Sequence, residues 1–349
     1  MRAVSGLLRS AAGLPENLRR QGIEALVRGP GLDKAGEVLM RLLSCITDKR
    51  ELPVFRKLGV DEVYFAVNDI PNYASAGAIG TAAGAREIVR AAHALRLKVF
   101  LAANGRETKP EGFEKEALVR KIKLVASAGV DALIVSSPGL FFTLREEKLG
   151  VPLHLSSVQP CFNTGTAKFF VENFGVSRII LPNQLAAREA DGILKYCKSA
   201  GVETEIFFYK FFGCPYINGA CYLHRPRYYT AVGAQPEGGM CRMGSCGSLA
   251  RVSPELVFRR EAAAIARTAA RLSVRLSRGG APRLLNAAAF FDYCLAGVGC
   301  VKYGTRTDDT PTKAANLKRI RTAMDVFGKL AGRFSPAEAR RRFVEAAEG

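Results

Sequence analysis

Short apolar runs alternate with longer amphipathic segments along most of the chain. The runs contain five to nine residues and occupy positions 38–46, 62–67, 98–104, 132–137, 153–157, 178–182, 205–212 and 299–306. Runs of this length without alternation are typical of parallel strands that are buried on both faces. The pattern therefore predicts eight strands separated by connecting segments.

The connecting segments have the spacing of amphipathic helices. Residues 84–96 (GAREIVRAAHALR) and 115–129 (KEALVRKIKLVASAG) are expected helices, each ending near a glycine that can serve as C′. A further helix is expected over about residues 313–331. Because crossovers between parallel strands are right-handed, such a chain forms a doubly wound sheet or a barrel, and the strand count favours a TIM-like (β/α) barrel. Functional residues are then expected at the carboxyl ends of the strands.

The pattern divides the chain into three parts. Residues 1–37 form a basic extension, residues 38–332 form the barrel, and residues 333–349 form a C-terminal helix with Ser335 and Glu338 as its capping box. The extension is rich in arginine and poor in acidic residues, which is typical either of an organelle targeting segment or of a basic surface helix.

A cysteine-rich insertion follows the seventh strand. Residues 214–250 are rich in Gly, Pro and Tyr, and they are too numerous for an ordinary strand-to-helix connection. They carry the spacing C-x6-C-x19-C-x4-C in Cys214, Cys221, Cys241 and Cys246. A metal bound by these thiolates would organise the loop. The spacing is looser than that of zinc knuckles and leaves zinc and an iron–sulfur cluster both open.

The other cysteines lie within strand and helix patterns. Cys45, Cys161, Cys197 and Cys300 are expected to be small buried apolar residues, and Cys294 is a reserve ligand. Nine cysteines in a chain of this size, without a convincing secretory signal, favour the reducing cytoplasm and metal or redox use over disulfides. No apolar run reaches the length of a membrane span.

The net charge of +19 indicates a polyanionic or phosphorylated partner. Arg267, Arg271, Arg275 and Arg278 share one face of an expected helix. With Tyr228 and Tyr229 this face could bind RNA, or it could simply be a solvated helix face.

Several segments together resemble peptidase family U-32, the collagenase-like proteases. Residues 152–185 (PLHLSSVQPCFNTGTAKFFVENFGVSRIILPNQL) are similar to the family's H-x-S-x-Q region, and residues 290–306 (FFDYCLAGVGCVKYGTR) resemble its closing motif. Residues 58–69 (LGVDEVYFAVND) resemble its opening strand, and the two cysteine pairs resemble its four-cysteine signature. The resemblance covers about residues 38–330.

This resemblance implies a TIM-like barrel with a 4Fe–4S cluster on Cys214, Cys221, Cys241 and Cys246. Zinc is the less favoured metal. Members of the family take part in oxygen-independent hydroxylation of RNA bases or of ubiquinone precursors, so an RNA or a small aromatic substrate is expected. A related U-32 subunit is a possible partner.

The expected substrate-contacting residues lie in and after the fifth strand and at the end of the eighth. His154, Gln159 and Asn163 could orient a substrate through hydrogen bonds. Lys302 and Arg306 are candidate anion clamps, with strand-end solvation as the alternative for Lys302.

A peptidase and a non-catalytic RNA- or partner-binding subunit remain the alternatives. Gln184 stands where the family often has a carboxylate, and Tyr209, Lys210 and Gly213 occupy the region of its usual His-Gly. Of the three histidines, His93 lies mid-helix, His224 lies in the cysteine segment, and His154 lies beside Ser156 and Ser157. Neither G-x-S-x-G nor H-E-x-x-H occurs, which weakens a hydrolase interpretation.

Overall fold

The computed structural model describes residues 40–73, 77–105, 112–183, 185–208, 285–306 and 308–348. Several predictions fall outside this described part: the basic extension 1–37, Gln184, Tyr209, Lys210 and Gly213, the cysteine segment 214–250 with His224, and the arginine stripe 267–278.

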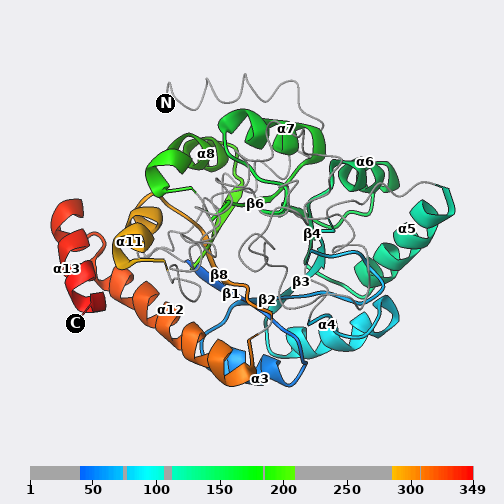
Figure 1. The fold of residues 1–349 in the computed structure, drawn as a ribbon, viewed down its shortest axis with the longest axis horizontal. Coiled ribbons are helices and arrows are strands. Elements are labelled where there is room, and N and C mark those ends of the chain that lie inside the picture. The colour runs from blue at the N-terminus through cyan, green and yellow to red at the C-terminus, as the bar shows by residue number, and fades with distance from the viewer. Residues whose placement is uncertain are drawn as a thin grey trace, which may run out of the picture.

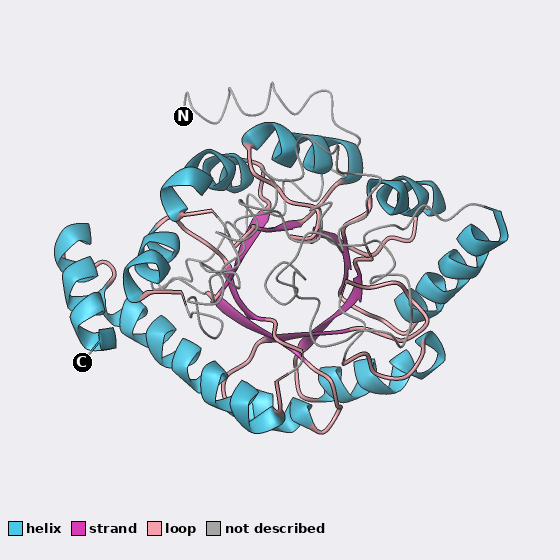
Figure 2. Cartoon of the chain, in the orientation of Figure 1, coloured by secondary structure: helices cyan, strands magenta, loops and turns pink. Residues whose placement is uncertain are grey.

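Eight parallel strands close into a barrel in sequence order (Figures 1 and 2). They are β1 (Arg41–Cys45), β2 (Glu62–Phe65), β3 (Lys98–Ala103), β4 (Ala132–Val135), β5 (Leu153–Leu155), β6 (Arg178–Ile180), β7 (Glu203–Phe207) and β8 (Cys300–Tyr303). The ring closes where β1 pairs with β8 and Leu43 lies opposite Lys302. The predicted TIM-like barrel is confirmed.

The described helices surround the strands on the outside of the ring (Figure 2). They are α3 (Glu51–Lys57), α4 (Ala85–Ala94), α5 (Gly112–Ser127), α6 (Pro138–Glu147), α7 (Thr164–Phe174), α8 (Ala187–Ser199), α11 (Ala287–Leu295), α12 (Thr310–Leu330) and α13 (Pro336–Glu348), with a short 3-10 turn, η2 (Ala82–Gly84), before α4. The larger apolar core lies between these helices and the outward side chains of the strands. No helix in the described part of the chain is long and apolar enough to cross a membrane.

The helix ends differ in part from the expectation. After α5, Gly129 adopts the left-handed conformation with φ 94°, as predicted. After α4 the left-handed residue is Arg96, with φ 58°, so the expected glycine is absent there. Lys148, which caps α6, is also left-handed, with φ 48°. Both long cationic side chains occupy a conformation that normally favours glycine.

Helix α13 packs against α11 outside the ring of helices (Figure 1). The Phe343 ring stacks on Phe290 with centroids 5.8 Å apart, and Arg340 forms an ion pair with Asp292. At the start of α13, Ser335 Oγ accepts a hydrogen bond from the Glu338 amide at 3.4 Å, which is the serine half of the expected capping box. The Glu338 carboxylate binds Arg341 and Arg342.

Candidate functional site: the interior and mouth of the barrel

The inner faces of the strands form a second, smaller core. Its members are Leu43, Cys45, Tyr64, Ala66, Phe100, Ala102, Ala132, Ile134, Ile180 and Cys300. Successive side chains of a strand point to opposite faces, so charged residues in register with these positions also face inward. The charged residues of the strands that face inward are Arg41, Glu62, Lys98, Arg178, Glu203, Glu205 and Lys302.

Arg178, on β6, holds three carboxylates from two strands together inside the barrel, Glu62 of β2 and Glu203 and Glu205 of β7. Its guanidinium donates to both oxygens of Glu62, at 2.7 and 2.9 Å. It also donates to Glu203 at 2.7 and 3.0 Å and to Glu205 at 3.1 Å. The Arg178 side chain is only 2% exposed. Because a buried charge is tolerated when it is paired and hydrogen-bonded, this cage makes a charged barrel interior possible.

Arg41 completes the cage from β1. Its Nε lies 3.0 Å from Glu62 Oε1, and its NH2 donates to Glu203. Burial alone would raise the pKa of Glu203, but the charges of Arg178 and Arg41 outweigh it and lower that pKa to about 2. Two arginines and the carboxylates of Glu62 and Glu203 therefore balance in charge, which leaves Glu205 to interact with a further cation.

That cation is Lys302, on β8. Its Nζ lies 3.0 Å from Glu205 Oε1, an ion pair without the alignment of a hydrogen bond. The same Nζ lies 4.2 Å from the centroid of the Tyr64 ring and 5.5 Å from that of Phe207. The Lys302 side chain is 5% exposed. A carboxylate and two aromatic faces therefore fix the ammonium inside the barrel.

Arg306 lies beyond the end of β8, against the same tyrosine. Its Cζ is 5.9 Å from the Tyr64 centroid, and its NH1 donates to Asn72 Oδ1 at 2.9 Å. The residue is buried. Lys302 and Arg306, two of the expected contact residues, are thus brought to one aromatic ring at the carboxyl end of the barrel.

His154, the third expected residue, is buried on the inner face of β5. Its ring meets Phe100 edge-on with centroids 4.8 Å apart. Burial lowers the pKa of His154 well below its usual value, and the charges of Arg178 and Lys302 lower it further. The imidazole is therefore neutral near pH 7. Its Nδ1 is buried and has no hydrogen-bond partner among the described residues, which leaves a polar atom that a bound substrate could satisfy.

Ser156 is not paired with His154. Ser156 Oγ accepts hydrogen bonds from Asn104 Nδ2 at 3.1 Å and from the Val158 amide at 3.3 Å. The described part of the chain therefore contains no Ser–His hydrogen bond here of the kind that activates a nucleophile.

The other two expected polar contacts have different surroundings. Asn163 is exposed and caps α7, because its Oδ1 accepts from the Thr166 amide at 2.8 Å. Gln159 is half-buried in the turn after β5, where its backbone N–H donates to Ser156 O at 3.0 Å. The structure thus assigns Asn163 a role in the fold.

The structure confirms the expected burial of Cys45, Cys161, Cys197 and Cys300. Cys45, Cys161, Cys197, Cys294 and Cys300 are free and buried. Cys294 Sγ lies 3.5 Å from Met40 Sδ, and burial raises its pKa well above the usual value. Cys214, Cys221, Cys241 and Cys246 lie outside the described residues. Within the described part, no cluster of three or more His, Cys, Asp or Glu could hold a metal ion.

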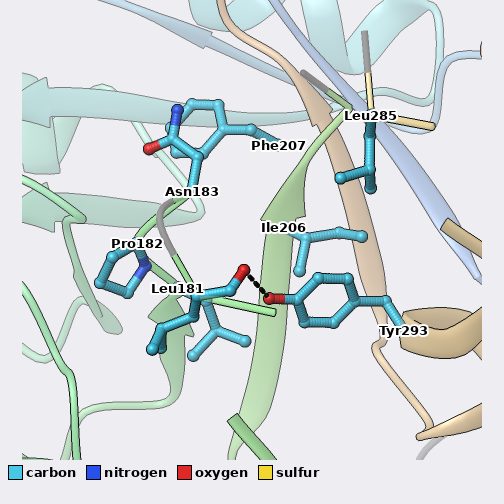
Figure 3. Close-up of a pocket in the computed structure, with 8 residues that line it drawn as sticks. Leu181, Pro182, Asn183, Ile206, Phe207, Leu285 and Tyr293 are labelled. Atoms are coloured by element: carbon cyan, nitrogen blue, oxygen red, sulfur yellow. Dashed lines mark hydrogen bonds between the residues drawn. The ribbon is translucent and has the colours of Figure 1, made fainter. Parts of the chain in front are cut away.

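A small pocket lies beside the ends of β6 and β7, against Leu285 and the α11 residue Tyr293 (Figure 3). Tyr293 OH donates across it to Leu185 O at 2.7 Å. It is lined by Leu181, Pro182, Asn183, Leu185, Ile206, Phe207, Leu285 and Tyr293, none of which is charged. The pocket is therefore distinct in chemistry from the cationic mouth.

Sequence reasoning did not identify the ion cage. Three members of the cage begin a strand or immediately precede an apolar run, namely Arg178, Glu203 and Glu205. A charged residue at such a position usually marks the exposed end of a strand. The available signal was the period of two, which places Glu203 and Glu205 on the same face of β7.

These features define a closed parallel β/α barrel of TIM type with a buried ion cage inside and a cationic mouth. A sequence model of peptidase family U32 matches residues 48–248. Because this match covers more than half of the chain, the chain belongs to peptidase family U32.

Known relatives share part of their length with this chain. Over 135 residues it is 33% identical to "tRNA hydroxylation protein P" of Escherichia coli (strain K12), covering 39% of this chain and 28% of that protein. The protein of the same name from Helicobacter pylori (strain J99 / ATCC 700824) is 27% identical over 216 residues, 62% of this chain and 47% of that protein. The matched regions thus span less than half of these relatives.

Among solved structures, the chain is similar to the U32 peptidase Mk0906. The two are 16% identical with a TM-score of 0.42, over 52% of this chain and 74% of that one. The YdjI aldolase from Escherichia coli K12 is 11% identical with a TM-score of 0.37, over 88% of each chain.

Proposed function

We propose that this chain supports oxygen-independent hydroxylation of a tRNA base, and that the barrel mouth binds the substrate. Membership of family U32 and the names of the relatives support the reaction class. A tRNA substrate would place the activity in the cytoplasm. The observation that carries the location is the convergence of Lys302 and Arg306 on the Tyr64 ring at the carboxyl end of the strands.

Lys302, Arg306 and His154 contact the substrate in two different ways in this proposal. Lys302 and Arg306 bind an anionic group of the substrate, because both cations are buried and held in place. His154 forms a hydrogen bond with the substrate at Nδ1, because that atom has no partner among the described residues and the ring is neutral.

Cys214, Cys221, Cys241 and Cys246 are the proposed ligands of a 4Fe–4S cluster, with zinc as the less favoured metal. Four thiolates are the donor set that such clusters use, and a bound cluster would supply electron transfer. Cys214 follows Phe208 by six residues, so the chain limits their separation to roughly 20 Å. The Phe208 amide donates to Lys302 O at 3.0 Å, which links this end of β7 to the mouth.

The geometry favours this function over a serine peptidase. Ser156 is engaged by Asn104 and Val158 and makes no hydrogen bond to His154. Peptidase activity is therefore kept as an alternative outcome of the experiment below.

The test is complementation of a bacterial strain that lacks its own tRNA hydroxylation protein P. Cells expressing this chain should regain the hydroxylated nucleoside in digested tRNA, measured by mass spectrometry. Lys302→Gln and His154→Ala should each lower it by about tenfold or more. Failure of the wild-type chain in the presence of soluble, folded protein contradicts the proposed reaction. Four other results would each redirect the assignment. They are hydroxylation of a ubiquinone-type aromatic precursor, cleavage of gelatin without iron, RNA binding without turnover, and a requirement for a related U-32 subunit.

The cluster has its own test. Protein purified without oxygen should contain about four irons per chain, as expected for one 4Fe–4S cluster. Cys221→Ala should lose the iron and the broad visible absorption. Cys294→Ala is the matched control and should keep both, because its thiol packs against Met40. Zinc, or no metal, in the wild-type protein would contradict the cluster.

A further inference from the structure

Glu205 is the carboxylate through which the ion cage contacts the mouth of the barrel. Its side chain is fully buried. Oε2 accepts from Arg178 NH1 at 3.1 Å, whereas Oε1 lies 3.0 Å from Lys302 Nζ. The two oxygens of one carboxylate thus serve two different cations.

The charges below Glu205 already balance. Arg41 and Arg178 are matched by the carboxylates of Glu62 and Glu203, all within one bonded group. Lys98 also begins its strand on the inner face, but its side chain is exposed to solvent, where water screens its charge. Arg41, Arg178, Glu62 and Glu203 together therefore contribute little net charge to the mouth.

Three charged side chains are linked around Tyr64 at the mouth, namely Lys302, Arg306 and, through Lys302, Glu205. Both cations lie against Tyr64, and Glu205 contacts Lys302 directly. Two positive charges and one negative charge leave an excess of one. A ligand group with a single negative charge would balance this excess, whereas a doubly charged group would leave an uncompensated negative charge in a buried site.

We propose that Glu205 determines charge specificity at the mouth, so that the barrel accepts a singly charged anionic group, such as a carboxylate or a phosphodiester, in preference to a phosphate monoester dianion. This rests on the proposed binding of an anion by Lys302 and Arg306. Glu205 acts through Lys302 and need not touch the ligand.

Glu203 provides a matched control on the same strand and the same face. It carries the same charge and binds Arg178 at 2.7 Å, but its second partner is Arg41, at the opposite end of the cage from Lys302. Glu203→Gln and Glu205→Gln therefore remove equal charge from the cage, and only the second removes it beside Lys302.

The experiment compares dimethyl phosphate, acetate and methyl phosphate as probes of the wild-type protein at pH 8. Methyl phosphate is a dianion at this pH because its second pKa is near 6, and the other two are monoanions. Affinity is taken from the rise in the unfolding midpoint with probe concentration. Acetate and dimethyl phosphate separate a carboxylate from a phosphodiester as the preferred group.

The wild-type protein should bind a monoanion more tightly than methyl phosphate. Glu205→Gln should shift that ratio toward methyl phosphate by about tenfold, as expected for one charge a few ångströms from the ligand. Glu203→Gln should shift it by less than about threefold, because its charge is farther from Lys302. In a Lys302→Gln background the Glu205 effect should shrink, as a double-mutant cycle would measure.

The outcomes separate the two proposals. Equal shifts in Glu205→Gln and Glu203→Gln, or none, would overturn the role of Glu205 while leaving anion binding intact. Probe affinities unchanged by Lys302→Gln would instead overturn anion binding at the mouth.

Discussion

At the scale of single residues, Arg178 is the side chain on which the buried charges depend. It hydrogen-bonds Glu62, Glu203 and Glu205, and it is almost fully buried. Removing one partner of a buried ionic group leaves the remaining charges uncompensated in a poorly solvated interior.

Arg178→Met should therefore lower the free energy of unfolding by about 3–5 kcal/mol. Urea denaturation followed by circular dichroism measures this loss. Arg340→Met is the control, because the Arg340–Asp292 ion pair is 45% and 39% exposed and should contribute less than about 1 kcal/mol. Similar small losses in both variants would show that the cage is not a major source of stability.

His154 should make stability depend on pH. Burial and the nearby cations lower its pKa in the folded protein well below its usual value of 6.5. Below pH 6.5 the unfolded chain binds a proton at His154 that the folded protein does not. Protonation therefore favours the unfolded chain, so His154 lowers the free energy of unfolding progressively as the pH falls below 6.5 and has no such effect above it. Wild-type unfolding free energy should drop more steeply from about pH 7 to about pH 5 than that of His154→Gln. Parallel curves would contradict a neutral, buried His154.

At the scale of elements, two helix ends carry non-glycine residues in the left-handed conformation. Arg96 and Lys148 have φ of 58° and 48°. For L-residues this conformation is unfavourable by about 1–2 kcal/mol, and glycine adopts it readily.

Arg96→Gly and Lys148→Gly should each raise the free energy of unfolding, by up to about 1 kcal/mol. Gly175 caps α7 with φ 63°, so Gly175→Ala is the inverse control and should lower stability by about 1 kcal/mol. Thermal unfolding of the three variants checks the prediction. Destabilisation by both glycine substitutions would mean that the long side chains contribute more than the backbone conformation costs.

At the scale of the whole molecule, a buried ion pair joins the elements that follow β1 and β8, the two strands that close the barrel. Lys313, in the first turn of α12, lies 2.9 Å from Glu51 Oε1 at the start of α3. Its Nζ also donates to Thr47 Oγ1 at 2.7 Å, and Glu51 accepts from the Thr47 amide at 2.7 Å. Both charged side chains are almost fully buried.

Lys313→Met should lower the unfolding free energy by about 3–5 kcal/mol, because it leaves the Glu51 charge buried without a partner. Glu51→Gln should remove part of that loss when combined with Lys313→Met. Urea unfolding of the two single variants and the double variant completes the cycle. Losses of unfolding free energy that simply add in the double variant would show that Lys313 and Glu51 stabilise the protein independently of each other.

The sequence determined the fold class and most of the elements. Apolar runs located all eight strands because a strand buried on both faces must be apolar along its length. It also placed His154 in the fifth strand and Lys302 and Arg306 at the end of the eighth, and it indicated that Cys45, Cys161, Cys197 and Cys300 are buried. The left-handed Arg96 was not predicted, since a local pattern of residues favours glycine there.

The tertiary structure alone decided which charges meet inside the barrel. Arg178 and Glu62 are separated by 116 residues and come together because the barrel closes with both on its inner face. The pairing of Glu205 with Lys302, and the absence of a partner for His154 Nδ1 within the described residues, depend on the same closure. Periodicity specifies which face of a strand a side chain occupies, whereas its partners depend on which strands surround that face.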